Sequence, residues 1–154
     1  MTPEAVLITG ASGNLGRAVA AAFAARGANL ALLDRNRAHL DAAFGGESDR
    51  RMLIAADLLD AGEVEAAVAS VAARFGRIDA LANIAGGFRM GTPVHATSDA
   101  DWNFLFDLNA RTVLHAARAV VPRMLAAGRG RIVNVGAFAA QKGVLLLTAG
   151  TYGN

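Results

Sequence analysis

Short runs of apolar residues recur along the chain, and longer stretches with helical spacing separate them. The apolar runs cover residues 5–9, 29–33, 52–56, 78–83 and 131–135. They are nearly continuous in apolar residues, which is typical of strands buried on both faces of a sheet. The helical stretches cover residues 15–26, 37–44, 63–75 and 99–127. Pro122 lies within the last stretch, and we expect the helix to kink or restart there.

The repeated order of strand and helix indicates an α/β fold. Right-handed helical crossovers between parallel strands place helices on both faces of the sheet. No repeat, low-complexity tract or linker interrupts the pattern, so we expect residues 1–154 to form one domain with a doubly wound parallel sheet. Gly27 is typical of a helix stop, and Asp60 with Glu63 is typical of a capping box at a helix start.

Length and composition are those of a globular domain. The chain has 154 residues, of which 54% are hydrophobic, and this is enough to bury a core. No apolar run is long enough to cross a membrane, and no secretory signal is visible. The absence of cysteine excludes disulfides and thiolate metal sites and fits a cytoplasmic protein.

Charged side chains and histidines indicate no second class of function. The net charge is +2, and the arginines are scattered without interleaved aromatic residues, so we expect no nucleic-acid partner. His39, His95 and His115 are isolated, with no carboxylate at metal-ligand spacing. We interpret them as surface or core histidines and expect no metal site.

A glycine-punctuated turn joins the first predicted strand to the first predicted helix. Gly10 can make the tight turn, Gly13 leaves the backbone open to a pyrophosphate, and Gly16 lets the helix pack close to the strand. The helix N-terminus offers N–H groups and the positive end of its dipole to phosphates. The turn therefore predicts a dinucleotide-binding βαβ unit. The residues that we expect at the cofactor are Gly10, Ser12, Gly13, Asn14, Leu15 and Gly16.

Further candidate residues follow the next three strands, at the edge where open α/β sheets bind ligands. Asp34 ends the second strand, where its carboxylate can bind the adenosine ribose hydroxyls and repel a 2′-phosphate. Arg35 follows directly and would favour that phosphate, so we favour NAD over NADP and leave both open. The candidates after the third and fourth strands are Asp57, Leu58, Asn83, Ala85 and Gly86.

In this order, the motifs resemble the short-chain dehydrogenase/reductase family. The resemblance covers nearly the whole chain and rests on the glycine turn, Asp34, Asp57-Leu58, Asn83-Ile84-Ala85-Gly86, Asn109, the strand at residues 131–135, and Tyr152. It implies a Rossmann-type fold and an NAD(P)-dependent oxidoreductase that interconverts an alcohol and a carbonyl of a small molecule by hydride transfer. It also implies a homodimer or homotetramer. The middle glycine of the turn departs from the family's commonest spacing, in which it falls one residue later.

The resemblance also assigns roles to individual residues. Asp57 would lie by the adenine, and Asn83 would brace the strand ends beside the cofactor. Tyr152 would exchange a proton with the substrate oxygen, and Asn109 would support a proton relay. A free tyrosine has a pKa of about 10, so the family places a lysine four residues later to lower it.

Two positions of the family's catalytic set are not filled. The serine corresponds to Ala137, or to Ala139 when counted back from Tyr152, and neither residue has a hydroxyl. The lysine would fall just beyond Asn154. We therefore expect the chain to be the first part of a longer dehydrogenase and to lack the C-terminal strands. The alternative is a catalytically inactive nucleotide-binding or regulatory protein with the same fold.

Overall fold

The computed structural model describes residues 3–89 and 92–137 of the chain. Strands and helices alternate along it, as the apolar pattern predicts. Their order is β1 (Ala5–Thr9), α1 (Asn14–Ala25), β2 (Asn29–Asp34), α2 (Arg37–Phe44), β3 (Arg51–Ala55), α3 (Ala61–Phe75), β4 (Ala80–Asn83), η1 (Val94–Ala96), α4 (Asp99–Phe106), η2 (Asp107–Arg111), α5 (Thr112–Ala126) and β5 (Arg131–Asn134).

The strands form one parallel sheet in the order β3-β2-β1-β4-β5. The chain starts in the middle of the sheet, moves outward through β2 and β3, and then crosses to the other side of β1 at β4. The carboxyl ends of β1 and β4 therefore lie side by side at the point where the strand order reverses, which is where open α/β sheets bind ligands. The expected doubly wound α/β fold is confirmed.

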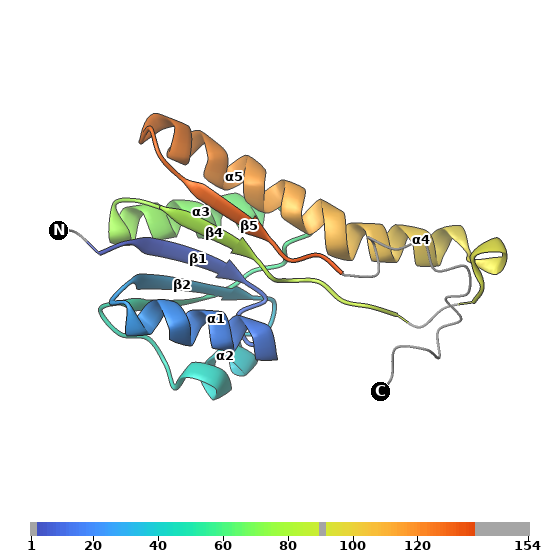
Figure 1. Cartoon of the computed structure of the whole chain (residues 1–154), viewed down its shortest axis with the longest axis horizontal. Coiled ribbons are helices and arrows are strands. Elements are labelled where there is room, and N and C mark those ends of the chain that lie inside the picture. The colour runs from blue at the N-terminus through green and yellow to red at the C-terminus, as the bar shows by residue number, and fades with distance from the viewer. Residues whose placement is uncertain (1–2, 90–91, 138–154) are drawn as a thin grey trace.

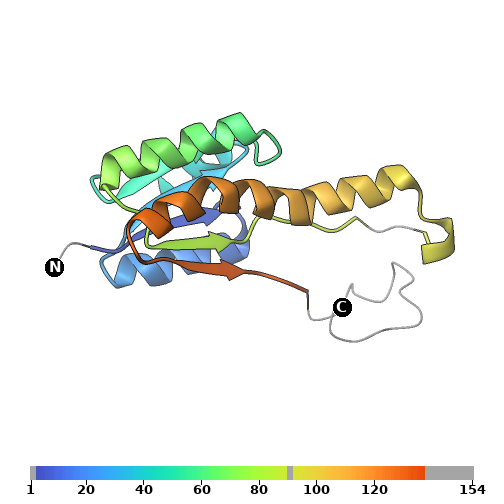
Figure 2. The ribbon, with the colours of Figure 1, turned by 90° about the horizontal axis from the view of Figure 1, so that it is seen from above.

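Helices cover both faces of the sheet, with α1 and α2 on one face and α3 and α5 on the other (Figures 1 and 2). Alternate residues of each strand point to opposite faces, so Val6 and Ile8 pack in the core with α1, whereas Leu7 packs with α3 and α5. All three are at most 1% exposed. Full burial of such a side chain contributes roughly 1.5–3 kcal/mol, which is why the strands are apolar on both faces.

The start of α1 differs from the starts of the other α-helices that begin after a loop. Side-chain oxygens of Asn36, Asp60 and Ser98 accept N–H groups in the first turns of α2, α3 and α4. The N-cap of α1 is Gly13, which has no side chain to accept such bonds. The predicted stop after α1 is confirmed, since the helix ends at Ala25 and Gly27 has a φ of 75°.

The long helix predicted at residues 99–127 is divided by a π-helical turn and not at Pro122. The π turn, η2, separates α4 from α5, and α5 continues through Pro122. The predicted restart at Pro122 was therefore wrong. A π turn accommodates one extra residue within a helix and is frequent at functional sites. Asn109 lies within this one.

The strand β5 is the outermost strand on its side of the described sheet. All four of its residues are exposed, and Val133 is 60% exposed. α4 extends beyond the carboxyl edge of the sheet (Figures 1 and 2). Within residues 3–89 and 92–137, no helix has the length and hydrophobicity that a membrane span requires.

Candidate cofactor site

A cavity of about 580 Å³ opens at the carboxyl ends of the strands. The glycine turn, the loop after β3 and the segment after β4 form most of its wall, and the helical segment around η2 completes it. Twelve of the predicted cofactor residues line it: Gly10, Ser12, Gly13, Asn14, Leu15, Gly16, Asp34, Arg35, Asp57, Leu58, Ala85 and Gly86. Phe104, Leu108 and Thr112 line it from the helical side.

The glycine turn brings the start of α1 against the cavity. Gly10 has a φ of 62°, and a Cβ atom there would lie 2.7 Å from Ala85 Cα, so only glycine fits. A Cβ at Gly16 would overlap the Gly10 carbonyl oxygen and lie 2.7 Å from Ala11 Cα. A Cβ at Gly13 would meet the protein only at 3.4 Å, at Gly10 O. The space beside Gly13 is therefore open toward the cavity, as an approaching phosphate requires.

Ser12 holds the carboxylate of Asp34 at the end of β2. The Ser12 hydroxyl donates to Asp34 Oδ2 at 2.6 Å, and the Ser12 N–H lies 3.2 Å from the same oxygen. The other oxygen, Oδ1, has a contact of 3.5 Å with the Asn36 N–H. Oδ2 is thus engaged by the glycine turn, and Oδ1 retains capacity to accept hydrogen bonds from hydroxyl groups.

The loop after β3 is held by a side chain of its own and by one of α3. The Asp57 N–H donates to Glu63 at 2.8 Å, and Asp57 Oδ1 accepts the Leu59 N–H at 2.9 Å. The predicted capping box is therefore only half formed: Asp60 caps α3, but Glu63 binds Asp57 and not Asp60. One contact comes from far along the chain, since His115 Nδ1 of α5 lies 2.9 Å from the Leu58 carbonyl oxygen.

Buried polar side chains connect the end of β4 to its neighbouring strands. Thr9 is 1% exposed, and its hydroxyl oxygen accepts the N–H groups of Ile84 at 3.1 Å and Ala85 at 3.2 Å. Asn83 lies outside the cavity lining, and its side chain donates to Asn134 Oδ1 at 2.8 Å. Thr9 therefore positions a segment that lines the cavity, and Asn83 links β4 to β5.

Asn109 binds the backbone after β4. Its Oδ1 accepts the Gly87 N–H at 3.0 Å, and its Nδ2 donates to the carbonyl oxygens of Gly87 and Leu105, both at 2.9 Å. A Cβ on Gly86 would come within 2.8 Å of Asn109 Oδ1. The π turn thus aims Asn109 at the segment 86–87, which borders the cavity.

Apart from Asn109, the expected catalytic positions lie at or beyond the end of the described chain. Tyr152 and Ala139 are outside the described residues. Ala137 is described, follows β5 and is exposed. Within the described segments, no group of three or more histidine, cysteine or acidic residues could hold a metal ion.

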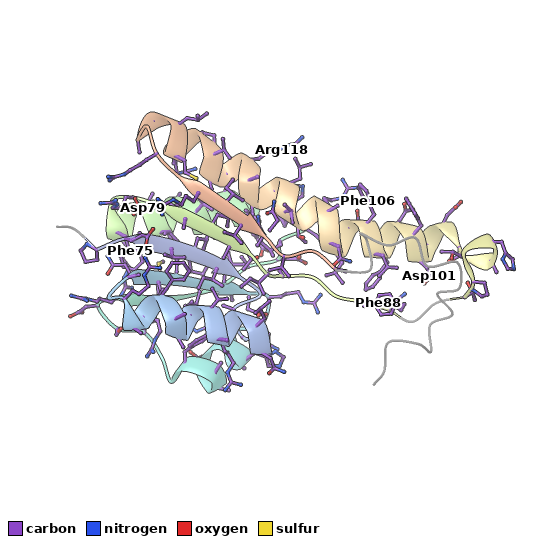
Figure 3. The ribbon with its side chains drawn as sticks, viewed as in Figure 1. Phe75, Asp79, Phe88, Asp101, Phe106 and Arg118 are labelled. Atoms are coloured by element: carbon purple, nitrogen blue, oxygen red, sulfur yellow. The ribbon has the colours of Figure 1, made fainter. Side chains whose placement is uncertain are left out.

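Arg89 connects the segment after β4 to the start of α4. Its guanidinium lies 3.2 Å from Asp101 Oδ1 and 3.8 Å from the centroid of the Phe104 ring. Bonds from the Ser98 hydroxyl and from Arg89 lower the pKa of Asp101. Phe88 and Asp101 are labelled on this extension in Figure 3, and Phe88 is 71% exposed.

Asp79 lies at the amino ends of the strands, at the other end of the sheet from the cavity, where it joins several segments (Figure 3). Its carboxylate accepts the Ala5 N–H at 2.9 Å and a bond from Arg77 Nε at 2.6 Å, and Arg129 lies 3.4 Å away. Burial raises the pKa of Asp79, but these hydrogen bonds and the two guanidinium charges outweigh it and lower the pKa overall. This cluster is structural, since it lies at the amino ends of the strands, away from the cavity.

Two features of the site were not predicted from the sequence. His115 was interpreted as an ordinary surface or core histidine, and its spacing along the chain gives no sign of its contact with Leu58. Phe104 also lines the cavity, and no motif in the sequence marks it. A second cavity of about 570 Å³ is lined mainly by alanines of α1 and by Phe44 and Arg51, and Asn14 is the predicted site residue that reaches it.

The comparison with known proteins agrees with this geometry. Residues 4–152 match the short chain dehydrogenase family. The chain is 40% identical over 140 residues to D-threitol dehydrogenase of Mycolicibacterium smegmatis, covering 89% of this chain and 54% of that protein. It resembles the crystal structure of levodione reductase with a TM-score of 0.86 and 32% identity, covering 94% of this chain and 58% of that one.

A third similar protein was solved with a nicotinamide cofactor. NAD⁺-bound xylitol dehydrogenase has a TM-score of 0.84 and 34% identity, covering 92% of this chain and 55% of that one. The chain thus spans about half the length of the proteins it matches. Because residues 4–152 match this family and the strands form its parallel sheet, the chain belongs to the short-chain dehydrogenase family.

Proposed function

We propose that this chain is the cofactor-binding part of an NAD(P)-dependent oxidoreductase that interconverts an alcohol and a carbonyl by hydride transfer. The observation that carries the proposal is the cavity at the strand ends, which gathers the uncapped start of α1, the carboxylate of Asp34 and the loop after β3. Relatives named as dehydrogenases support the same reaction class. Its substrate would be a small alcohol or carbonyl compound.

The residues of the cavity suit the parts of a dinucleotide. The open N–H groups at the start of α1, with no side-chain cap at Gly13, would bind the pyrophosphate. Asp34 Oδ1 would accept hydrogen bonds from the adenosine ribose hydroxyls. The segment at Asp57 and Leu58 would border the adenine. The bound nicotinamide would supply the hydride acceptor or donor, and the protein would orient it.

We favour NAD over NADP on the arrangement around Asp34. Ser12 holds Asp34 Oδ2 in place from the glycine turn, so a 2′-phosphate would meet a carboxylate that is anchored. Two negative groups within hydrogen-bond distance repel each other, whereas two ribose hydroxyls can both donate. Arg35 also lines the cavity and is the residue that would favour the phosphate.

Several finer assignments rest on the family resemblance. Tyr152 would exchange the proton with the substrate oxygen, and Asn109 would contribute to proton relay or, through Gly87, to the shape of the cavity. A homodimer or homotetramer is proposed on the same ground, and a cytoplasmic location is proposed on the absence of cysteine. The alternative function is an inactive nucleotide-binding or regulatory protein. It is favoured by the alanine, Ala137 or Ala139, at the position where the resemblance places the family's serine.

Calorimetric titration of the chain with NAD⁺ and NADP⁺ tests the proposal. We expect saturable binding of NAD⁺ that is tighter than binding of NADP⁺. Replacement Asp34→Ala removes hydrogen bonds to a charged acceptor and should weaken NAD⁺ binding roughly 10- to 100-fold. Asp41→Ala removes an exposed carboxylate on α2 that pairs with Arg37 and should leave binding unchanged.

Turnover separates the two candidate functions. Reduction of NAD⁺ with a panel of small alcohols would support the oxidoreductase. Saturable NAD⁺ binding without turnover, by a protein whose intact mass agrees with its complete coding sequence, would support the inactive alternative. A folded chain that binds neither dinucleotide would refute both.

A further inference from the structure

The loop after β3 forms one wall of the cavity, and a hydrogen bond from α5 reaches its backbone. Ala56, Asp57, Leu58 and Leu59 all line the cavity. The Ala56 N–H donates to the Asp34 carbonyl oxygen of β2 at 3.0 Å. Glu63 of α3 accepts the Asp57 N–H, and Asp57 accepts the Leu59 N–H. These bonds hold the loop to β2 and α3, and none of them joins it to α5.

His115 joins the loop to α5. His115 belongs to α5, the helix whose first residue, Thr112, also lines the cavity. Its Nδ1 atom lies 2.9 Å from the Leu58 carbonyl oxygen, in a partly buried position. Thr112 itself is 4% exposed, and its hydroxyl donates to Leu108, another lining residue. The hydrogen bond from His115 therefore connects the loop to a rigid helical wall.

We propose that His115 is a positioning residue that holds the loop after β3 at the spacing from α5 that an adenine nucleotide requires. This inference rests on the proposed function and adds a residue to which the motifs assign no role. A carbonyl oxygen can only accept, so Nδ1 must carry a hydrogen atom. Loss of that donor frees the loop to move away from α5 and leaves a partly buried carbonyl without this partner.

Substitutions at His115 separate the donor from the bulk of the ring. The amide nitrogen of asparagine can stand where Nδ1 stands, whereas that of glutamine can stand where Nε2 stands. We expect His115→Asn to bind NAD⁺ as the unmodified chain does. His115→Leu and His115→Gln should bind it roughly three- to tenfold more weakly, as expected for one lost hydrogen bond. His39→Leu, on the exposed face of α2, is the matched control and should have no effect.

The affinity for ADP-ribose shows whether His115 affects the adenine half of the binding site. ADP-ribose contains the adenine half of NAD⁺ without nicotinamide, so its affinity should fall by the same factor in His115→Leu.

The imidazole ¹⁵N signals of His115 in the unmodified chain provide a readout that needs neither variants nor ligand. We expect them to show the hydrogen atom on Nδ1.

Each outcome decides the inference. A neutral ring with its hydrogen atom on Nε2 would overturn it, and so would equal NAD⁺ affinity of His115→Leu and the unmodified chain. If the unmodified, folded chain binds neither NAD⁺ nor ADP-ribose, the proposed function fails and this inference fails with it. If the chain binds both and only the His115 effect is missing, the proposed function stands and the inference alone is wrong.

Discussion

Replacement of Thr9 by valine isolates the contribution of one buried hydroxyl to the site. Threonine and valine have nearly the same shape, so Thr9→Val keeps the packing at the end of β1 and replaces the hydroxyl with a methyl group. That oxygen accepts the N–H groups of Ile84 at 3.1 Å and Ala85 at 3.2 Å. Thr9 is 1% exposed, so water cannot easily take its place.

The expected cost follows from the two donors that lose their acceptor. Each buried N–H left without a partner costs about 1–3 kcal/mol. Because Ile84 and Ala85 are only partly buried, we expect a total near the lower end, about 2 kcal/mol. NAD⁺ affinity should also fall, since Ala85 lines the cavity.

Urea unfolding followed by circular dichroism measures this cost. Thr9→Ser is the matched control because it keeps the hydroxyl and loses the methyl group, and it should cost less than Thr9→Val. A valine variant as stable as the unmodified chain, or more stable than the serine variant, would refute the assignment of these hydrogen bonds.

Two further predictions concern the glycine turn and the opposite edge of the sheet. Gly16→Ala should destabilise the chain by about 1–3 kcal/mol, because the new Cβ meets backbone that cannot move aside. The Cβ of Gly13→Ala would meet the protein only at 3.4 Å, so this variant should unfold at nearly the same urea concentration as the unmodified chain. It should, however, bind NAD⁺ more weakly in calorimetry. Asp79→Asn should lower the free energy of unfolding by roughly 2–4 kcal/mol at pH 7. The pKa of Asp79 is lowered in the folded state. The contribution of its carboxylate to the free energy of unfolding is therefore present above the unfolded pKa of about 3.9, and it is lost as the pH falls through the folded pKa. The difference in the free energy of unfolding between Asp79→Asn and the unmodified chain should therefore shrink in urea titrations at acidic pH. A difference that grows on acidification would contradict this reasoning. An equal loss of stability in the exposed control Asp49→Asn would also contradict it.

Much of the fold could be predicted because its signals are local. The strands buried on both faces are nearly continuous in apolar residues, and glycines mark the turn at Gly10 and the stop at Gly27. The parallel topology then brings Asp34 and Asp57 to the cavity, since parallel strands end at the same edge of a sheet.

The rest depends on contacts between distant segments, which a local pattern does not encode. The spacing of apolar residues cannot show that one extra residue is accommodated at η2. The sequence therefore predicted a kink or restart of the helix at Pro122 instead. Asp60 and Glu63 have the spacing of a capping box, but Glu63 finds the N–H of Asp57 instead. The contact of His115 with Leu58 requires α5 to pack beside the loop after β3, and only the tertiary structure places it there.

The central claim is that the cavity at the strand ends binds a dinucleotide, and ¹H–¹⁵N correlation spectra recorded during a titration with NAD⁺ test it most directly. We predict that the shifted amide signals are those of the glycine turn from Ser12 to Gly16, of Asp34, and of Leu58. A well-dispersed spectrum that NAD⁺ leaves unchanged would contradict the account. So would shifts confined to the second cavity, at Ala21 and Phe44.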